Sequence, residues 1–480
     1  MLDLMIKNAL VVLPGGAQKV HVGVRDGKIA YIGSEDAESL ASIDGTGKFL
    51  IPGGVEGHAH IWEPMHEGWT NGKEEWLADS EGTTRAALFG GTTCVASFAF
   101  MDVHSTEVIY NVAKAVESRK QIFQNHSFTH FVFHPVLTGT PSDETIGSIK
   151  EAIEEGTTSF KVFTTDVTSK QAGVRIETGS MLAIMRMLAK HNGILMVHAE
   201  DDELVRYMEA RLGREGHDQA YNLNLVHSSL SEGIAFNKVL QLAAEAGSAT
   251  YFAHVTGRRG IREMKRAQME GQAVYGEVLH NYLMFSNEDY HKENGIRFHT
   301  YPAMKGLEDQ KALWEALADG TLTMVSTDEY TTPYKTKVQG QTVETACGGL
   351  NGIETRGIVA FSEGYSKGRL SLERFVEVFS TNPAKVLGLY PLKGTIQVGS
   401  DADLVLWDPD VEKTVTLDDL HQPSDYSIFV GMEAKGWPVT VILDGTVVVD
   451  GGTLYGKPTD GRFIKRKMTD HVLKGYYKDR

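Results

Sequence analysis

Two histidines one residue apart, His58 and His60, lie in the stretch IPGGVEGHAHIWEP at residues 51–64. Side chains two apart on a β-strand share a face, so both imidazoles can reach a single ion. Other residues of metal-binding type also follow apolar runs, namely His198, His254 and Asp328. A lone histidine at a strand end is more often a core residue, but this set together favours a metal site. Imidazole and carboxylate suit zinc, and also manganese, iron or nickel.

Lys161 lies inside the apolar run SFKVF, where an ammonium group is costly to bury without a partner. Desolvation lowers the pKa of a lysine, so part of it is the free amine, which can add carbon dioxide. The resulting carbamate has two anionic oxygens and is suited to bridging two cations. The alternative is a lysine that extends to the edge of the fold and pairs with Asp166.

Strand-like apolar runs alternate with helical segments through the middle of the chain, at Phe49–Pro52, Thr93–Phe98, Phe131–Leu137, Ser159–Phe163, Ile194–His198, Thr250–Val255, Ala273–Val278 and Leu322–Thr327. Eight such runs over about 280 residues favour a (β/α)8 TIM barrel, of class α/β, over an open doubly wound sheet. Barrels carry their functional side chains at the carboxyl ends of the strands, where the candidate ligands fall.

Short alternating strands occupy both ends of the chain, with hairpin turns predicted at Asp26–Gly27 and Asp444–Gly445. We therefore expect a small β-sandwich domain from residues 1–50 and 386–455, and a metal-binding barrel from residues 51–385. The Lys- and Arg-rich residues 456–480 have little apolar periodicity and predict a solvated tail, with a subunit-contact arm as the alternative.

The composition excludes several classes of function. The 480 residues contain 47 Lys and Arg against 63 Asp and Glu, a net charge of −16, which argues against a nucleic-acid partner. No basic segment followed by a long apolar one opens the sequence, and no window is apolar enough to span a membrane, so we expect a cytoplasmic protein. Cys94 and Cys347, the two cysteines, exclude a disulfide framework and a CxxC zinc knuckle.

These motifs resemble the cyclic amidohydrolases of the hydantoinase, dihydropyrimidinase, allantoinase and dihydroorotase group over nearly the whole chain. The resemblance is carried by HAHIWEP, SFKVF, VHAED, AHVTG and STDEY, and by residues 380–409, which are similar to hydantoinases almost throughout. It implies a (β/α)8 barrel with two divalent ions and a carboxylated Lys161 bridging them. It assigns one ion to His58, His60 and Asp328 and the other to His198 and His254.

The resemblance also implies a reaction, the hydrolytic opening of a cyclic amide, imide or ureide ring. Hydroxide held between the ions would attack the ring carbonyl, and Asp328 would take up its proton and return it to the leaving nitrogen. Zinc is the expected metal, with manganese, iron or nickel as alternatives, and the family implies a homo-oligomer, a tetramer or a dimer.

Departures from the family pattern all concern the substrate. Asp166 replaces the tyrosine that helps stabilise the oxyanion in hydantoinases, and Trp62 replaces the arginine that holds a carboxylate in dihydroorotases. Tyr301 stands at a serine position and Gly348 at an asparagine position, while Glu329 replaces a histidine. An acidic, dihydroorotate-like substrate is therefore not expected. We expect Asp166 to accept a hydrogen bond from a substrate N–H or cationic group, and Tyr301 and Gly348 to contact the substrate.

Alternatives to this activity remain open. Non-catalytic relatives lose metal ligands, whereas all six are present here. Hydrolysis of a linear amide or carbamate by the same site is a second possibility. The aromatic residues Trp62, Trp69, Tyr301 and Tyr330 are candidates for the substrate pocket, although rim packing explains them equally well.

Overall fold

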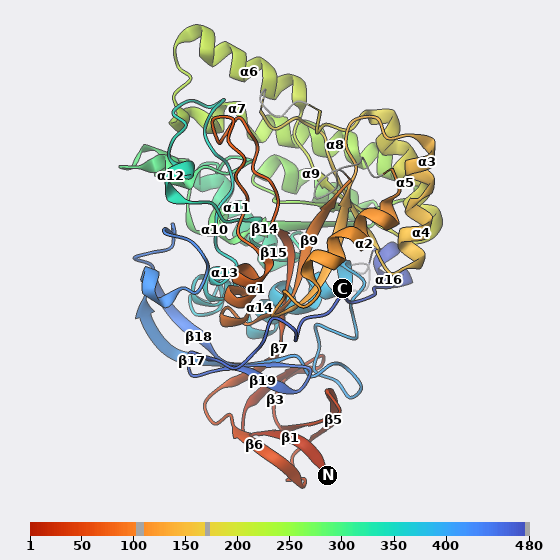
Figure 1. Ribbon diagram of the computed structural model, residues 1–480, viewed down its shortest axis with the longest axis vertical. Helices are drawn as coiled ribbons and strands as arrows, with labels where there is room; N and C mark the ends of the chain where they lie inside the picture. Colours follow the sequence, from red (N-terminus) through yellow and green to blue (C-terminus); the bar gives the residue numbers. More distant parts are fainter. Residues whose placement is uncertain (102–109, 169–172, 476–480) are drawn as a thin grey trace.

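The computed structural model describes residues 1–101, 110–168 and 173–475. It has two parts, a large one in which helices surround strands and a small one made of strands, which lies at the bottom of Figure 1 with the N-terminus. Among the described helices, none is both long enough and apolar enough to span a membrane.

The large part is a closed barrel of parallel strands. Around the barrel the strands follow chain order: β8 (Gly54–His60), β9 (Thr92–Phe100), β10 (His130–Val136), β11 (Ser159–Phe163), β12 (Ile194–His198), β13 (Ala249–Phe252) and β14 (Val274–Leu279). Two short strands, β15 (Met324–Ser326) and β16 (Glu329–Tyr330), fill the eighth position. Because β15 pairs with β14 and β16 pairs with β8, the break at Thr327 and Asp328 lies at the seam where the barrel closes. The expected (β/α)8 barrel is confirmed.

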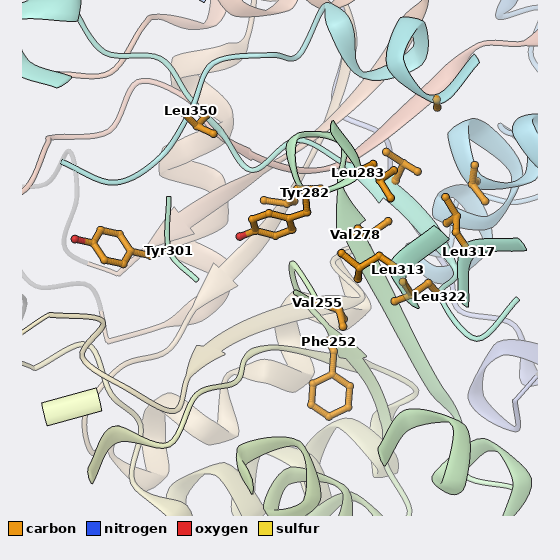
Figure 2. Close-up of a cluster of buried hydrophobic side chains, with 14 of the residues drawn as sticks. Phe252, Val255, Val278, Tyr282, Leu283, Tyr301, Leu313, Leu317, Leu322 and Leu350 are labelled. Carbon is orange, nitrogen blue, oxygen red and sulfur yellow. The ribbon is translucent and has the colours of Figure 1, made fainter. Parts of the chain in front are cut away.

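Helices follow the strands and cover the outside of the barrel (Figure 1): α1 (Ser80–Phe89), α2 (Val112–Phe123), α3 (Asp143–Gly147), α4 (Ile149–Glu154), α5 (Thr178–His191), α6 (Asp202–Glu215), α7 (Leu223–Val226), α8 (Ser229–Ala246), α9 (Arg258–Met269), α10 (His280–Met284), α11 (Leu307–Asp319), α12 (Tyr334–Lys337), α13 (Thr355–Val359), α14 (Leu372–Val376) and α15 (Asn382–Val386). Asp79, Asp201 and Ser228 cap three of these helices by accepting a backbone N–H. Figure 2 shows part of the core beneath, where Leu313 and Leu317 of α11 gather with Val278 of β14.

One predicted barrel strand belongs elsewhere. The run Phe49–Pro52 forms β7, which pairs with β17 (Leu404–Thr414) and β2 (Leu10–Leu13) in the small part. The first barrel strand is the next one, β8, and the chain passes between the two sheets at Gly53 and Gly54. A Cβ on Gly53 would meet Thr93 at 2.2 Å, and one on Gly54 would meet Phe379 at 2.3 Å, so the close crossing requires glycine. Because β8 follows β7 almost directly, the sequence gives no sign that the chain changes sheet here.

The small part is a sandwich of two sheets, as expected. One sheet, in the order β5-β4-β1-β6, is entirely N-terminal: β1 (Leu2–Lys7), β4 (His21–Arg25), β5 (Lys28–Gly33) and β6 (Ser39–Asp44). The other joins both chain ends in the order β20-β19-β18-β17-β7-β2-β3, with β3 (Gly16–Lys19), β18 (Glu433–Leu443), β19 (Thr446–Asp450) and β20 (Thr453–Leu454). Ile6 and Val22 of the first sheet pack with Leu404 and Ile442 of the second.

Both predicted hairpin turns are present. Asp26 and Gly27 connect β4 to β5, and Asp444 and Gly445 connect β18 to β19. All four residues have positive φ, which is the geometry of the type I′ turn that Asp-Gly favours. The two turns also pack together, since a Cβ on Gly27 would lie 3.1 Å from the carbonyl of Asp444.

The prediction of a solvated C-terminal tail is wrong for residues 456–475, which pack against the barrel. Met468 and Val472 are buried in a cluster with residues of the barrel strands, and Val472 lies in the short helix α16 (Asp470–Leu473). The buried Arg466 donates to Ser159 Oγ at 2.7 Å and to the carbonyl of Phe133. A few buried residues spaced along a basic segment are enough to anchor it to the barrel, while its lysines stay exposed.

Candidate metal centre

A cavity of about 230 Å³ opens at the carboxyl ends of the barrel strands. Its lining includes most of the residues singled out in the sequence, namely His58, His60, Trp69, Lys161, His198, His254, Tyr301, Asp328, Tyr330 and Gly348. The remaining lining residues are Glu63, Pro64, His66, Phe100, Phe163, Val167, Val174 and Gly349. A compact group of polar side chains is thus surrounded by an aromatic and apolar wall.

Three of these side chains converge on one point. Asp328 Oδ1 lies 3.0 Å from Nε2 of His58 and 3.2 Å from Nε2 of His60. The other ring nitrogen of each histidine is hydrogen-bonded to a carboxylate, His58 Nδ1 to Glu277 and His60 Nδ1 to Glu63 at 2.8 Å. With Nδ1 donating, a neutral ring directs its Nε2 lone pair at Asp328, an arrangement that a cation or bound protons must neutralise.

The backbone at the site is held in uncommon conformations. Asp328 has φ of 50° and His254 has φ of 34°, although neither is glycine. Such residues cost roughly 1–3 kcal/mol each and cluster at functional sites. At Asp328 this geometry breaks the eighth strand between β15 and β16 and directs the carboxylate toward β8. Burial alone would raise the pKa of Asp328, but the charges and hydrogen bonds of His58 and His60 hold it well below its usual value.

Lys161 lies beside this group on β11 with no exposed surface. Its Nζ has no hydrogen-bond partner in the described part of the chain, and its nearest ring neighbours are Phe163 and Phe98, with centroids at 5.0 and 5.5 Å. Burial lowers the pKa of Lys161 to about 8 against the opposing charges of Asp328 and Glu277. The amine of Lys161, whose burial the sequence predicted to be costly, is therefore buried without a partner. Because a pKa near 8 leaves an appreciable free amine at neutral pH, modification by carbon dioxide fits this position.

His198 and His254 lie next to the first group. Their ring centroids are 4.5 Å apart, and the ring of His254 lies 5.4 Å from that of His58. Burial lowers the pKa of both, and that of His254 falls well below its usual value. Neutral imidazoles are the form that binds metal ions. The structure thus brings all six candidate ligands to one place.

Buried carboxylates that hydrogen-bond to the candidate ligands were not predicted from the sequence. Glu63 orients His60, Glu277 orients His58, and Glu200 accepts from His198 Nε2 at 3.0 Å. Glu277 also accepts from the backbone N–H of His254 at 3.0 Å. Such outer carboxylates fix the tautomer and orientation of ligating histidines. Glu63 and Glu200 could have been recognised because each stands two or three residues after its histidine, but Glu277, on β14, carries no local signal.

The donor set and its surroundings fit divalent cations. Acceptor atoms of His58, His60 and Asp328 all lie within 4.8 Å of one another. Beside them stand a buried amine without a partner and two neutral imidazoles. Nitrogen and carboxylate donors of this kind are those of zinc and related transition metals.

Trp62 lies outside the cavity lining, although the sequence suggested a substrate contact. Its side chain is 39% exposed and packs against Trp76, with ring centroids 5.5 Å apart. The backbone of Trp62 has φ of 49°, and its carbonyl accepts from Arg119 at 2.9 Å. The strand has already ended at His60, so the alternation that would direct Trp62 inward does not apply.

Asp166 also lies outside the lining, which differs from the substrate contact expected from the sequence. Its Oδ1 accepts from the backbone N–H of Gly173 at 3.1 Å and of Arg175 at 2.8 Å, and its Oδ2 pairs with Arg206 of α6. Both oxygens are therefore engaged within the protein. The adjacent Val167 lines the cavity instead, with φ of 65°.

Glu329 stands where the family has a histidine, and its carboxylate is hydrogen-bonded to other parts of the protein. Its Oε2 accepts from the backbone N–H of Gly352 and of Ile353, both at 2.7 Å, and Thr331 donates to its other oxygen. Burial raises the pKa of Glu329 to about 7 despite these hydrogen bonds. The residue anchors the turn after Gly349 and does not line the cavity.

Comparisons with known proteins agree with this geometry. Residues 49–448 match the model of the amidohydrolase family. The chain is similar to the D-hydantoinase of Ralstonia pickettii, with 32% identity over 97% of this chain and 99% of that one. It is likewise similar to the D-hydantoinase of Geobacillus stearothermophilus, at 33% identity over 96% of each. The crystal structure of a dihydropyrimidinase from Brevibacillus agri superposes with a TM-score of 0.90 at 28% identity, covering 98% of this chain and 99% of that one.

The family model covers most of the chain, and the relatives match it almost from end to end. The chain therefore belongs to the amidohydrolase family, as a cyclic amidohydrolase of the hydantoinase and dihydropyrimidinase group. The family recognised from the HAHIWEP, VHAED and STDEY motifs is confirmed.

Proposed function

We propose that this protein is a metal-dependent hydrolase that opens the ring of a small cyclic amide, imide or ureide. The observation that carries the proposal is the convergence of His58, His60 and Asp328 beside the unpaired Lys161. Support also comes from relatives named hydantoinase and dihydropyrimidinase, which match the chain almost end to end.

The proposed site holds two divalent ions. His58, His60 and Asp328 would hold one, His198 and His254 the other, and a carbamate on Lys161 would bridge them. Zinc is the expected metal, with manganese, iron or nickel as alternatives. When bound, such ions supply water activated for attack near neutral pH and polarise the carbonyl of the substrate.

Asp328 is the proposed general acid and base. As a carboxylate it is ionised at neutral pH, so it can accept a proton from the attacking water. It then returns that proton to the ring nitrogen as the C–N bond breaks, which leaves a carboxylic acid derivative and a free amine or amide. The fixed backbone at Asp328 keeps the carboxylate at one place during both transfers.

The cavity wall supplies orientation and excludes water. The wall includes Trp69, which packs against Tyr301 and Tyr330, and also Phe163 and Val167. Rigid apolar surfaces hold a compact ring against the polar group and strengthen the electrostatic interactions there. A cytoplasmic location and assembly into a dimer or tetramer belong to the same proposal.

Ring opening tests the proposal directly. The metal-loaded protein should be assayed with hydantoin, 5-phenylhydantoin, dihydrouracil, allantoin and succinimide, with linear amides and carbamates in the same panel. We expect turnover of at least one ring, lost in Asp328→Asn with the metal content measured on the same samples. Turnover of linear substrates alone would contradict ring opening, and full activity of Asp328→Asn would contradict the role of the carboxylate.

A further inference from the structure

Gly348 lacks a side chain because Tyr301 fills the space that one would need. A Cβ on Gly348 would lie 2.0 Å from Cδ2 of Tyr301 and 2.3 Å from its Cε2. The backbone of Gly348 is outside the left-handed region, in contrast to Gly349 at φ of 84°, so its conformation alone would admit any residue. The neighbouring ring is what excludes a side chain here.

The ring of Tyr301 is fixed on several sides. It lies parallel to Trp69 with centroids 5.8 Å apart, and its neighbour His227 meets it at 65° with centroids 4.9 Å apart. The hydroxyl donates to the carbonyl of Ala346 at 3.0 Å. In Figure 2 Tyr301 stands apart from the leucines of the core cluster. The ring therefore has little freedom to move away from Gly348.

Lys337 holds the backbone on both sides of this contact. The side chain is fully buried, and its Nζ donates to the carbonyls of His299 at 2.6 Å, Cys347 at 2.8 Å and Gly349 at 2.6 Å. Two of these carbonyls flank Gly348, and the third lies two residues before Tyr301. Three acceptors satisfy an ammonium group completely, so Lys337 fixes the distance between the two segments.

We propose that Tyr301 and Gly348 act as one steric unit, positioned by Lys337, that selects cyclic amides carrying a flat aromatic group. Both residues line the cavity together with His60 and Asp328. The hydroxyl of Tyr301 is already engaged with Ala346, so the unit offers a substrate an aromatic surface and no polar side chain. Stacked and edge-to-face contacts between aromatic rings stabilise a bound ring beyond what the burial of its surface contributes.

This inference rests on the proposed function, so its test includes measurements that do not need turnover. The variants are Gly348→Ala, Tyr301→Ser and the two combined. Gly179→Ala is the matched control, because a Cβ there meets nothing within 4 Å. For each variant, kcat/KM for 5-phenylhydantoin and for hydantoin, the melting temperature, the metal content and binding of 5-phenylhydantoin by calorimetry should be measured.

We expect Gly348→Ala to lose about tenfold or more in kcat/KM and to melt at a lower temperature, because overpacking a fixed contact is costly. Tyr301→Ser should abolish the preference for the phenyl-bearing ring and restore most of the stability lost in Gly348→Ala. Gly179→Ala should match the wild type in kcat/KM, metal content and binding, and should melt at the same or a slightly higher temperature, because alanine favours a helix more than glycine does. Lys337→Met should raise KM more than it lowers kcat, at unchanged metal content.

Additive effects of Gly348→Ala and Tyr301→Ser on melting temperature and on binding would overturn the steric unit. An unchanged phenyl preference in Tyr301→Ser would overturn the substrate class. The wild type could bind 5-phenylhydantoin, with non-additive effects of Gly348→Ala and Tyr301→Ser on that binding, and yet open no ring. In that case the proposed function fails while this inference stands.

Discussion

Asp328 Oδ1 lies 3.0 Å from Nε2 of His58, although His58 is on β8, the first strand of the barrel, and Asp328 lies in the break between β15 and β16, the last two. Pairing of Glu329 and Tyr330 with Ala59 and His60 closes the barrel at this point. The candidate metal centre is therefore built across the seam of the fold. A complete site requires a closed barrel, so metal binding and barrel stability are expected to be linked.

Removal of metal should inactivate the protein and lower its melting temperature. Without a cation, Glu63 and Asp328 outweigh burial and raise the pKa of His60 to about 9, so protons take the place of the metal, and the stabilisation that metal binding adds to the folded state is lost. Dialysis against a chelator followed by calorimetry and elemental analysis checks the outcome, and added zinc should restore both properties. A preparation that is fully active with no more than one ion per chain would contradict the two-metal site.

Lys161→Ala and Lys161→Met should both lose activity and the paired ions. Methionine keeps a side chain of similar length without an amine, so the two variants separate loss of packing from loss of the carbamate. Short carboxylic acids should partly restore the alanine variant by supplying the missing bridge. Full activity in Lys161→Arg would rule out a carbamate, because a guanidinium stays charged and does not form one.

Asp166→Ala should raise KM while leaving the metal content unchanged. The carboxylate holds the amides of Gly173 and Arg175, next to the cavity residue Val174. Loss of hydrogen bonds to a charged group costs roughly 1.5–3 kcal/mol of local stability, so the segment that carries Val174 should be held less firmly and bind the substrate more weakly.

Arg206→Gln should show a weaker effect of the same kind, because it removes the ion pair of Asp166 and leaves the backbone contacts. Arg211→Gln is its control, since Arg211 lies on the same helix and pairs with Glu215 at the surface. Wild-type KM in Asp166→Ala would show that the carboxylate does not position the wall.

Asp444→Asn should make folding stability less sensitive to acid. Burial would raise the pKa of Asp444, but His130 and Arg462 lower it to about 2. A carboxyl whose folded pKa is depressed stabilises the fold above its unfolded pKa, about 3.9, and this contribution is lost as pH falls toward 2. Urea midpoints between pH 5 and 2 should therefore fall more steeply for the wild type than for the variant. Parallel curves would contradict the assignment, and asparagine preserves the turn because Asn-Gly also favours type I′ geometry.

The metal ligands could be predicted because their signals are local. Each histidine ends or directly follows an apolar run, and Lys161 lies within one, so strand ends alone place them at one edge of the barrel. The hairpins at Asp26–Gly27 and Asp444–Gly445 are equally local, since two residues define the turn. These features need no knowledge of the tertiary contacts.

Other features depend on contacts between distant segments. Phe49–Pro52 has the composition of a barrel strand, and only its pairing with β17 and β2 assigns it to the small part. Asp166 stands at the family position of a substrate contact, yet the amides of Gly173 and Arg175 occupy its carboxylate. Likewise, the basic C-terminal residues have little apolar periodicity, and Met468 and Val472 are buried only because barrel strands pack against them.

X-ray diffraction at the absorption edge of the bound metal tests the central claim most directly. The account predicts two anomalous peaks per chain in the ring-opening protein, one among His58, His60 and Asp328 and one beside His198 and His254, with continuous density from Lys161 to both. A single peak in a fully active crystal, or an unmodified Lys161 between two peaks, would contradict it.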